Sequence, residues 1–157
     1  MTDEVQVHLH CTMWGTAPLR LADVLFRSDH LLIVVYDYLT PLDLAMRSPS
    51  QRARAFVDRI ENEGVSAALA AAEDVTELSY EALETLRVYD GGWFGREAVS
   101  IQSKNNDSRI VRVHGAVELD GFVDAVRSLL ASHDVTVERR DGIAYEFNGL
   151  LGRLSRY

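Results

Sequence analysis

Short segments in which apolar and polar residues alternate constrain the fold of this chain more than any other feature. From Val5 to Met13 every second residue is apolar or a cysteine, and the residues between them are polar. This two-residue period is typical of a β-strand that buries one face. Further strands are expected at residues 19–25 and 31–38, joined by a polar hairpin turn at 27–30.

A helical period replaces this alternation after the third expected strand. Apolar residues then recur at helical spacing, Ser48 can cap the first turn, Pro49 suits its first position, and Gly64 ends the helix. An alanine-rich stretch follows at 65–72, where helix propensity is high. We therefore expect two helices in a hairpin over residues 48–72.

Strand patterns return in the second half and lead into one amphipathic helix. The turn sequences 90–92 and 105–107 separate short strands. The apolar residues of 119–130 share one helical stripe, so this helix has to cover an apolar surface. The expected elements of this half are a strand from residue 74, strands at 83–89, 98–102 and 109–114, the helix at 119–130, a hairpin of 135–138 with 143–147, and a short helix at 150–154.

Length and apolar content indicate one domain. The chain has 157 residues, of which 47% are hydrophobic, enough to bury a core of its own. Within residues 1–157 we distinguish N-terminal strands (1–40), a helical insertion (48–72), a second sheet with its capping helix (75–131) and a C-terminal extension (135–157).

Charge and patterning argue against two classes of partner. A net charge of −8 repels nucleic acid backbones and anionic lipids. The longest strongly apolar run, 31–36, is far shorter than the ~20 residues that cross a bilayer, and the N-terminus lacks the pattern of a secretory leader. Cys11, the single cysteine, has no partner for an internal disulfide. We expect a cytoplasmic protein without nucleic acid or membrane partners.

The basic residues are unusual, because Lys104 is the only lysine among 16 of them, against 24 acidic residues. This balance resembles that of salt-adapted haloarchaeal proteins, although the codon usage of a GC-rich genome would also favour arginine. The sequence therefore suggests a halophilic protein.

Seven short strands followed by one amphipathic helix resemble a pleckstrin-homology-like (PH-like) domain of the bacterial and archaeal type. The resemblance is strongest between Leu78 and Ala131 and rests on apolar positions at Tyr80, Leu83, Leu86, Trp93, Phe94, Val99, Ile101, Ile110, Val111, Val113 and Phe122. It implies an α+β fold in which a small antiparallel split barrel is closed by the C-terminal amphipathic helix, here with an inserted helical hairpin and a short C-terminal extension. Lipid-binding members carry basic residues in the first loop, and 14–18 has none, so phosphoinositide binding is not implied.

His8 and His10 are candidate metal ligands. Two residues apart on one strand, they project from the same face at a spacing of about 7 Å. We favour polar histidines on a solvated face, with Cys11 buried and inert on the other. In the alternative, a third ligand comes from His30, His114 or His133.

The aromatic pair Trp93 and Phe94 is the other unusual feature, since it follows Asp90 and two glycines. No phosphate-binding glycine pattern is present. The favoured interpretation is a turn followed by an aromatic anchor in the core, and the alternative is a ligand loop, which an exposed Trp93 would indicate. The candidate interaction surface comprises Trp93, Phe94, Arg96 and Phe56.

No set of residues predicts catalysis, and no cofactor is expected. The preferred hypothesis is a non-enzymatic binding or scaffold module that recognises a protein or peptide through a sheet edge or barrel groove. One alternative is a small metal-binding or ligand-sensing protein that uses His8 and His10. Another is a homo-oligomeric structural protein, a homodimer for example, in which the helical hairpin packs against a second copy.

Overall fold

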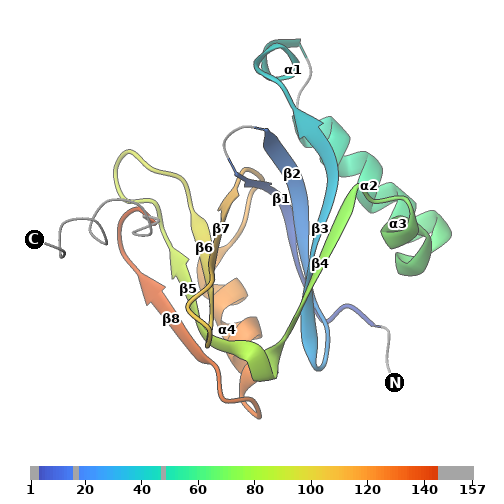
Figure 1. Ribbon diagram of the computed structural model, residues 1–157. Coiled ribbons are helices and arrows are strands. Elements are labelled where there is room, and N and C mark those ends of the chain that lie inside the picture. The colour runs from blue at the N-terminus through green and yellow to red at the C-terminus, as the bar shows by residue number, and fades with distance from the viewer. Residues whose placement is uncertain (1–3, 16–17, 47–48, 145–157) are drawn as a thin grey trace, which may run out of the picture.

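The computed structural model describes residues 4–15, 18–46 and 49–144, which form an eight-stranded mixed sheet with four α-helices (Figure 1). The strands are β1 (Val7–Trp14), β2 (Leu19–Phe26), β3 (His30–Leu39), β4 (Asp74–Ser79), β5 (Leu83–Tyr89), β6 (Ala98–Ser103), β7 (Ser108–Val113) and β8 (Thr136–Arg140). The helices are α1 (Pro41–Met46), α2 (Pro49–Glu63), α3 (Val65–Ala70), the 3₁₀ helix η1 (Tyr80–Ala82) and α4 (Leu119–Leu130). None of the described helices combines the length and apolar character needed to cross a membrane.

The strand order is β4-β3-β2-β1-β7-β6-β5-β8, and all neighbours are antiparallel except β5 and β8. Because β1 pairs with both β2 and β7, it joins two halves that bend towards one another (Figure 1). Strands β4 and β8 form the two edges and do not pair with each other within the described residues. The sheet is therefore open. The described strands do not establish the expected split barrel that is closed by a helix.

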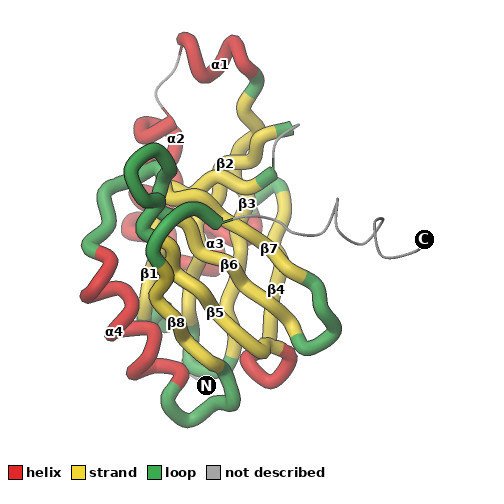
Figure 2. The backbone as a smooth tube through the Cα atoms, turned by 90° about the vertical axis from the view of Figure 1, so that its left-hand side faces the viewer, coloured by secondary structure: helices red, strands yellow, loops and turns green. Residues whose placement is uncertain are grey.

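The main core lies on the inner face of the bent sheet. It combines buried residues of both halves, such as Leu9, Ile33 and Ile101, with the apolar stripe of α4. Phe122 of α4 meets Phe26 edge to face, with ring centroids 6.0 Å apart. Helix α4 runs beside β8 and β1 (Figure 2). The helix predicted at 119–130 is confirmed as α4. Its apolar stripe is buried against the sheet and at the same time covers the apolar inner face of the sheet.

A second layer covers the outer face of β2 and β3. Helices α2 and α3 pack there through Ala53, Phe56 and Ala68, and the Phe56 ring stacks on Tyr36 with centroids 4.4 Å apart. The helical hairpin expected between the third and fourth strands is thus confirmed, although the cap expected at Ser48 lies outside the described residues.

Helix α1 was not expected from the sequence. Its first turn carries a reciprocal cap: the Thr40 amide donates to Asp43 Oδ2 at 2.9 Å, and the Asp43 amide donates to Thr40 Oγ1 at 3.2 Å. Pro41 occupies the first helical position, where its missing N–H costs nothing.

The first arm of the expected C-terminal hairpin, residues 135–138, is confirmed as a strand, β8, but its partner among the described residues is β5. Strand β8 pairs in parallel with β5, with Thr136 opposite Thr85, because α4 carries the chain back along the sheet before β8 begins. Residues 143–144 are not in a strand. The rest of the second arm and the helix expected at 150–154 lie outside the described residues.

Candidate functional site

A bulge in β1 gives the outer face its unusual geometry. Leu9 pairs with Val24 and Thr12 with Ala22, so that both His10 and Cys11 lie opposite the single residue Asp23. Cys11 has a φ of 56°, which is uncommon for a residue other than glycine.

The bulge overturns part of the sequence interpretation. Leu9 belongs to the inner core, whereas Cys11 and Met13 belong to the cluster beneath α2. The prediction that Cys11 is buried is confirmed, but the prediction that it shares a face with Leu9 is wrong. The extra residue moves every apolar position after it to the opposite face.

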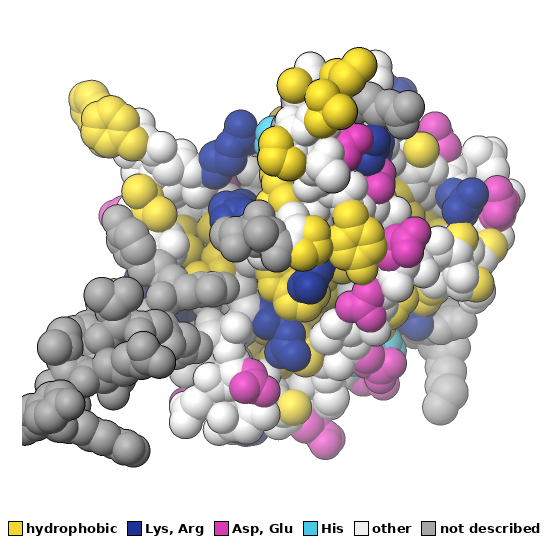
Figure 3. All heavy atoms as spheres, turned by 45° about the horizontal axis from the view of Figure 1, so that its top comes forward, with side chains coloured by type: hydrophobic (Ala, Val, Ile, Leu, Met, Phe, Trp, Pro, Cys, Tyr) yellow, Lys and Arg dark blue, Asp and Glu magenta, His cyan; other side chains and the backbone are white. Residues whose placement is uncertain are grey.

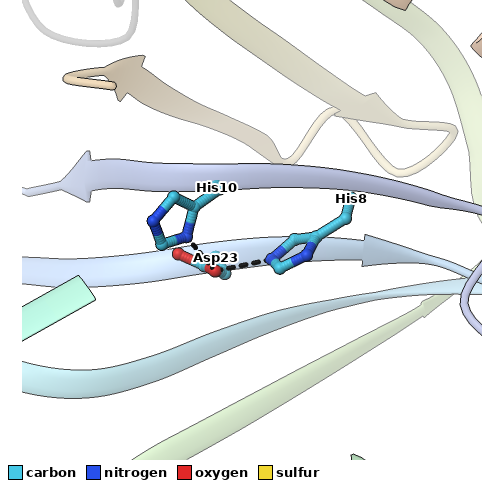
Figure 4. A group of neighbouring side chains, drawn as sticks. All are labelled: His8, His10 and Asp23. Atoms are coloured by element: carbon cyan, nitrogen blue, oxygen red, sulfur yellow. Dashed lines mark hydrogen bonds and ion pairs between the residues drawn. The ribbon is translucent and has the colours of Figure 1, made fainter. Parts of the chain in front are cut away.

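Asp23 is fully buried and accepts four hydrogen bonds. Its Oδ2 accepts from His8 Nε2 at 2.6 Å and from His10 Nδ1 at 2.8 Å (Figure 4). Its Oδ1 accepts from the Cys11 amide and from the Tyr36 hydroxyl, each at 2.8 Å. A buried carboxylate needs such partners, because burying a charge without them costs several kcal/mol.

The same contacts set the protonation of the cluster. Burial by itself raises the pKa of Asp23, but the hydrogen bonds from His10 and His8, together with their charge, outweigh it and hold the pKa below its usual range. The hydrogen bond to Asp23 in turn raises the pKa of His10. Burial, and next the Asp23 charge, raise the pKa of the Cys11 thiol, so Cys11 is a poor nucleophile near neutral pH.

Asp23 is the residue that sequence analysis missed. In the metal-binding alternative the third ligand was to come from His30, His114 or His133, but none of these joins the cluster of His8 and His10. His30 pairs with Asp29, and His133 packs on Tyr80. The signal was a lone acidic residue inside the apolar strand 19–26, since a carboxylate in a buried strand requires partners on its neighbours.

His8, His10 and Asp23 form the one cluster of described residues whose side chains could share a metal ion. One ligand atom from each lies within 4.8 Å of the others. A groove of about 360 Å³ opens beside them between β1 and α2 and is lined by His10, Ser50, Arg54, Val57, Asp58 and Glu61. The cluster therefore has access to solvent on one side.

The loop between β5 and β6 forms a second candidate site. Trp93 is 96% exposed and Phe94 is 95% exposed, so the aromatic anchor expected in the core is wrong, and the condition set for a ligand loop is met. Phe56, by contrast, is a residue of α2 that is buried against the sheet, and it shares no surface with this pair.

Hydrogen bonds donated by backbone amides hold this aromatic loop against the end of β8. Asp90 Oδ1 accepts from the amides of Gly92 and Gly142 at 2.9 and 2.8 Å, and these bonds lower the pKa of Asp90. The Gly91 amide donates to the Gly142 carbonyl at 2.9 Å. Gly91 has a φ of +82°, and a Cβ there would lie 2.6 Å from the Arg96 carbonyl carbon, so only glycine fits.

A groove of about 450 Å³ lies at the base of the aromatic loop and is lined by Gly15, Gly95, Arg96, Ala98, Ile110, Arg112, Ile143 and Ala144. Arg112 donates to the Gly15 carbonyl, whereas Arg96 makes no hydrogen bond or salt bridge to another described residue. Figure 3 shows apolar side chains projecting from this end of the molecule, with arginine or lysine side chains nearby. We call this the arginine groove.

No protein-family model matches the sequence, and no curated protein matches it significantly. Among solved structures, the fold is similar to the hSac2 domain from the human phosphoinositide phosphatase Sac2, with a TM-score of 0.54 and 9% sequence identity over 93% of this chain and 82% of that one. It is also similar to the C-terminal domain of an unknown protein from Leishmania infantum, with a TM-score of 0.47 and 8% identity over 82% of this chain and 84% of that one. At such identities the likeness concerns the fold alone.

Proposed function

We propose that this chain is a non-enzymatic binding module whose recognition surface is the aromatic loop together with the arginine groove. The carrying observation is that two adjacent aromatic side chains, Trp93 and Phe94, are almost wholly exposed on a loop held by hydrogen bonds. Exposed aromatic side chains next to arginine are typical of the residues that contribute most to protein interfaces.

The charges around the loop favour an acidic partner. The chain as a whole carries −8, yet the groove is lined by Arg96 and Arg112 and, among the residues that the structure describes, by no acidic side chain. Arg96 is the better anchor, since its guanidinium has no hydrogen bond or ion pair with the described residues and can take a carboxylate in two parallel hydrogen bonds. The occupant we propose is a protein segment that presents a large apolar side chain beside an aspartate or glutamate.

The sheet edges suit a partner less well than the groove does. β4 carries Asp74 and Glu77, and β8 carries Glu138, Arg139 and Arg140. Charged side chains on an edge strand discourage another strand from pairing there. Groove docking is therefore the mode we favour over strand addition.

The order β4-β3-β2-β1-β7-β6-β5, with α4 directly after β7, is consistent with the PH-like split barrel that the sequence pattern resembles, and β8 is an addition to it. The similarity to the hSac2 domain concerns the arrangement of the elements alone. What a relative with this fold binds gives no guidance here, because function depends on the residues of the site.

The test is a peptide-display selection on the purified chain, followed by affinity measurements on the selected peptides. We expect enriched peptides to combine acidic residues with a large apolar one. The double variant Trp93→Ala/Phe94→Ala should weaken binding at least about tenfold, as should Arg96→Glu. The matched control is Leu42→Ala/Met46→Ala, which removes two exposed apolar side chains from α1 and should leave affinity within about twofold.

Three outcomes would contradict the proposal. Equal losses in the loop variant and in the α1 control would mean that binding follows exposed apolar area in general. Binding to vesicles that depends on Trp93 and Phe94, without peptide binding, would make the loop a membrane anchor. A concentration-dependent mass that these substitutions abolish would make it a contact between copies of this chain.

A further inference from the structure

We propose that His8, His10 and Asp23 bind one divalent transition-metal ion, Zn²⁺ in the first place, with a coordination position left open towards the groove beside α2. The cluster shares no residue with the aromatic loop or the arginine groove. A metal site here is therefore independent of the proposed partner surface.

The cluster places three ligand atoms, one each from His8, His10 and Asp23, within 4.8 Å of one another. Asp23 Oδ2 lies 2.6 Å from His8 Nε2 and 2.8 Å from His10 Nδ1. Ligand atoms around a zinc ion lie about 2.0–2.2 Å from the metal, so they stand a little over 3 Å apart. Small rotations of two partly exposed rings open the cluster by that amount, whereas Asp23 stays in place on β2.

Proton positions allow the change from hydrogen bonding to coordination. Without metal, Nε2 of His8 and Nδ1 of His10 donate to Asp23. With metal, each of these nitrogens presents its lone pair, and a neutral ring keeps its proton on the other nitrogen. His10 loses one proton to solvent if it is charged beforehand, so metal binding should weaken as the pH falls.

Asp23 Oδ1, the oxygen that does not face the histidines, accepts the kind of supporting hydrogen bonds that carboxylate ligands of metals usually have. Asp23 Oδ1 accepts from the Cys11 amide and from the Tyr36 hydroxyl, and Phe56 stacks on the Tyr36 ring. Such partners behind a ligand fix its orientation and keep it ionised. These two bonds satisfy Oδ1 without the histidines and leave Oδ2 aimed at the two rings.

The surroundings give an ion both access and a free position. The side chains of His8 and His10 are 29% and 38% exposed, so an ion reaches them from solvent. The groove of about 360 Å³ beside His10 has room for water or a small ligand, and its wall carries Arg54 together with Asp58 and Glu61. Three protein ligands with an open position distinguish this site from a closed structural zinc site.

The donor set selects the class of metal. Two imidazole nitrogens and one carboxylate suit Zn²⁺, Fe²⁺, Co²⁺ or Ni²⁺, whereas Mg²⁺ and Ca²⁺ prefer oxygen ligands. Mg²⁺ is therefore the natural negative control.

The experiment compares the untagged, chelator-stripped chain with the variant His8→Gln/His10→Asn. In this variant the amide of Gln or Asn can place its NH₂ near the former Nε2 or Nδ1 and still donate to Asp23, but the imidazole ligands are gone. The matched control, His133→Gln, removes a histidine outside the cluster. Titration with Zn²⁺ followed by calorimetry, and with Co²⁺ followed by visible absorption, measures stoichiometry and coordination.

We expect the wild type and His133→Gln to bind one equivalent of Zn²⁺ and to melt at a higher temperature with it. The double variant should melt near the metal-free wild type, lose at least about tenfold in Zn²⁺ affinity, and show no thermal shift with the ion. Wild-type binding no tighter than that of the double variant, or an equal response to Mg²⁺, would overturn the proposal. Loss of Zn²⁺ binding in Trp93→Ala/Phe94→Ala would also contradict it, because the two sites share no residue.

Discussion

Replacing Asp23 with asparagine should destabilise the protein in a way that depends on pH. The asparagine carbonyl can still accept from the Cys11 amide and the Tyr36 hydroxyl, as Oδ1 does now. Its NH₂ group, however, faces His8 Nε2 and His10 Nδ1, where Oδ2 now accepts. A neutral ring can turn its lone pair to that NH₂, whereas a protonated ring cannot, so donor then faces donor.

The direction of the pH effect follows from the two shifted groups. The pKa of Asp23 is lowered, so its contribution is present above the usual carboxyl pKa of about 4 and is lost as the pH falls through the lowered value. The pKa of His10 is raised, so its contribution is complete below about 6.5 and is lost as the pH rises through the raised value. The cluster therefore stabilises the fold most between about pH 4 and pH 6.5.

Hydrogen bonds to a buried charged group contribute about 1.5–3 kcal/mol, so we expect Asp23→Asn to lower the free energy of unfolding by about 2 kcal/mol near pH 5.5. The loss should be smaller near pH 9, because the contribution of His10 falls as the pH rises through its raised pKa. Urea denaturation with EDTA at both pH values measures it. The matched control is Asp29→Asn, which alters a second Asp–His pair, with His30, whose carboxylate is exposed, and it should change stability by less than about 0.5 kcal/mol. An equal loss at both pH values, or equal losses in the two variants, would refute the reasoning.

Three further predictions concern the core, the aromatic loop and the charge. Phe122→Ala should cost about 3–4 kcal/mol in urea denaturation and the exposed Asp124→Ala less than about 0.5, and similar costs would contradict the packing of α4. Gly91→Ala should lower the free energy of unfolding by at least about 1 kcal/mol more than Gly64→Ala does. Both glycines have a positive φ, but only at Gly91 would a Cβ clash with backbone atoms, those of Arg96. Equal melting temperatures of the two variants would argue against the loop structure. A net charge of −8 should lower the melting temperature when salt is reduced from molar to low concentration, and a constant value would exclude salt adaptation.

Local sequence patterns predicted most of the elements. The strands expected at 83–89 and the helix expected at 119–130 agree in both bounds with β5 and α4, and the helical hairpin lies where the change of period placed it. The spacing of apolar residues in these segments follows from the burial of one face, and a helix or strand has to bury that face whichever segment it packs against. The fully exposed Trp93 and Phe94 depart from that rule, which is why the sequence interpretation placed an aromatic anchor in the core instead.

The candidate sites depended on contacts between segments far apart in the chain. The bulge at His10 and Cys11 cannot be inferred from the sequence, because the alternation of apolar and polar residues continues unbroken to Met13. The hydrogen bond from the Cys11 amide to Asp23 depends on this bulge. The partnership of β8 with β5 likewise escaped prediction, since a nearby turn sequence suggested a hairpin. The partner of such a strand is decided by which edge of the sheet is still unpaired once the core has formed.

The sequence by itself determined which residues are apolar, where periods begin and end, and that two histidines share one strand face, because these properties are local. Only the tertiary structure decided that a buried aspartate joins those histidines and that an aromatic pair projects beside two arginines. The physical reason is that a side chain's environment is set by the segments packed against it, and those are chosen by register and topology.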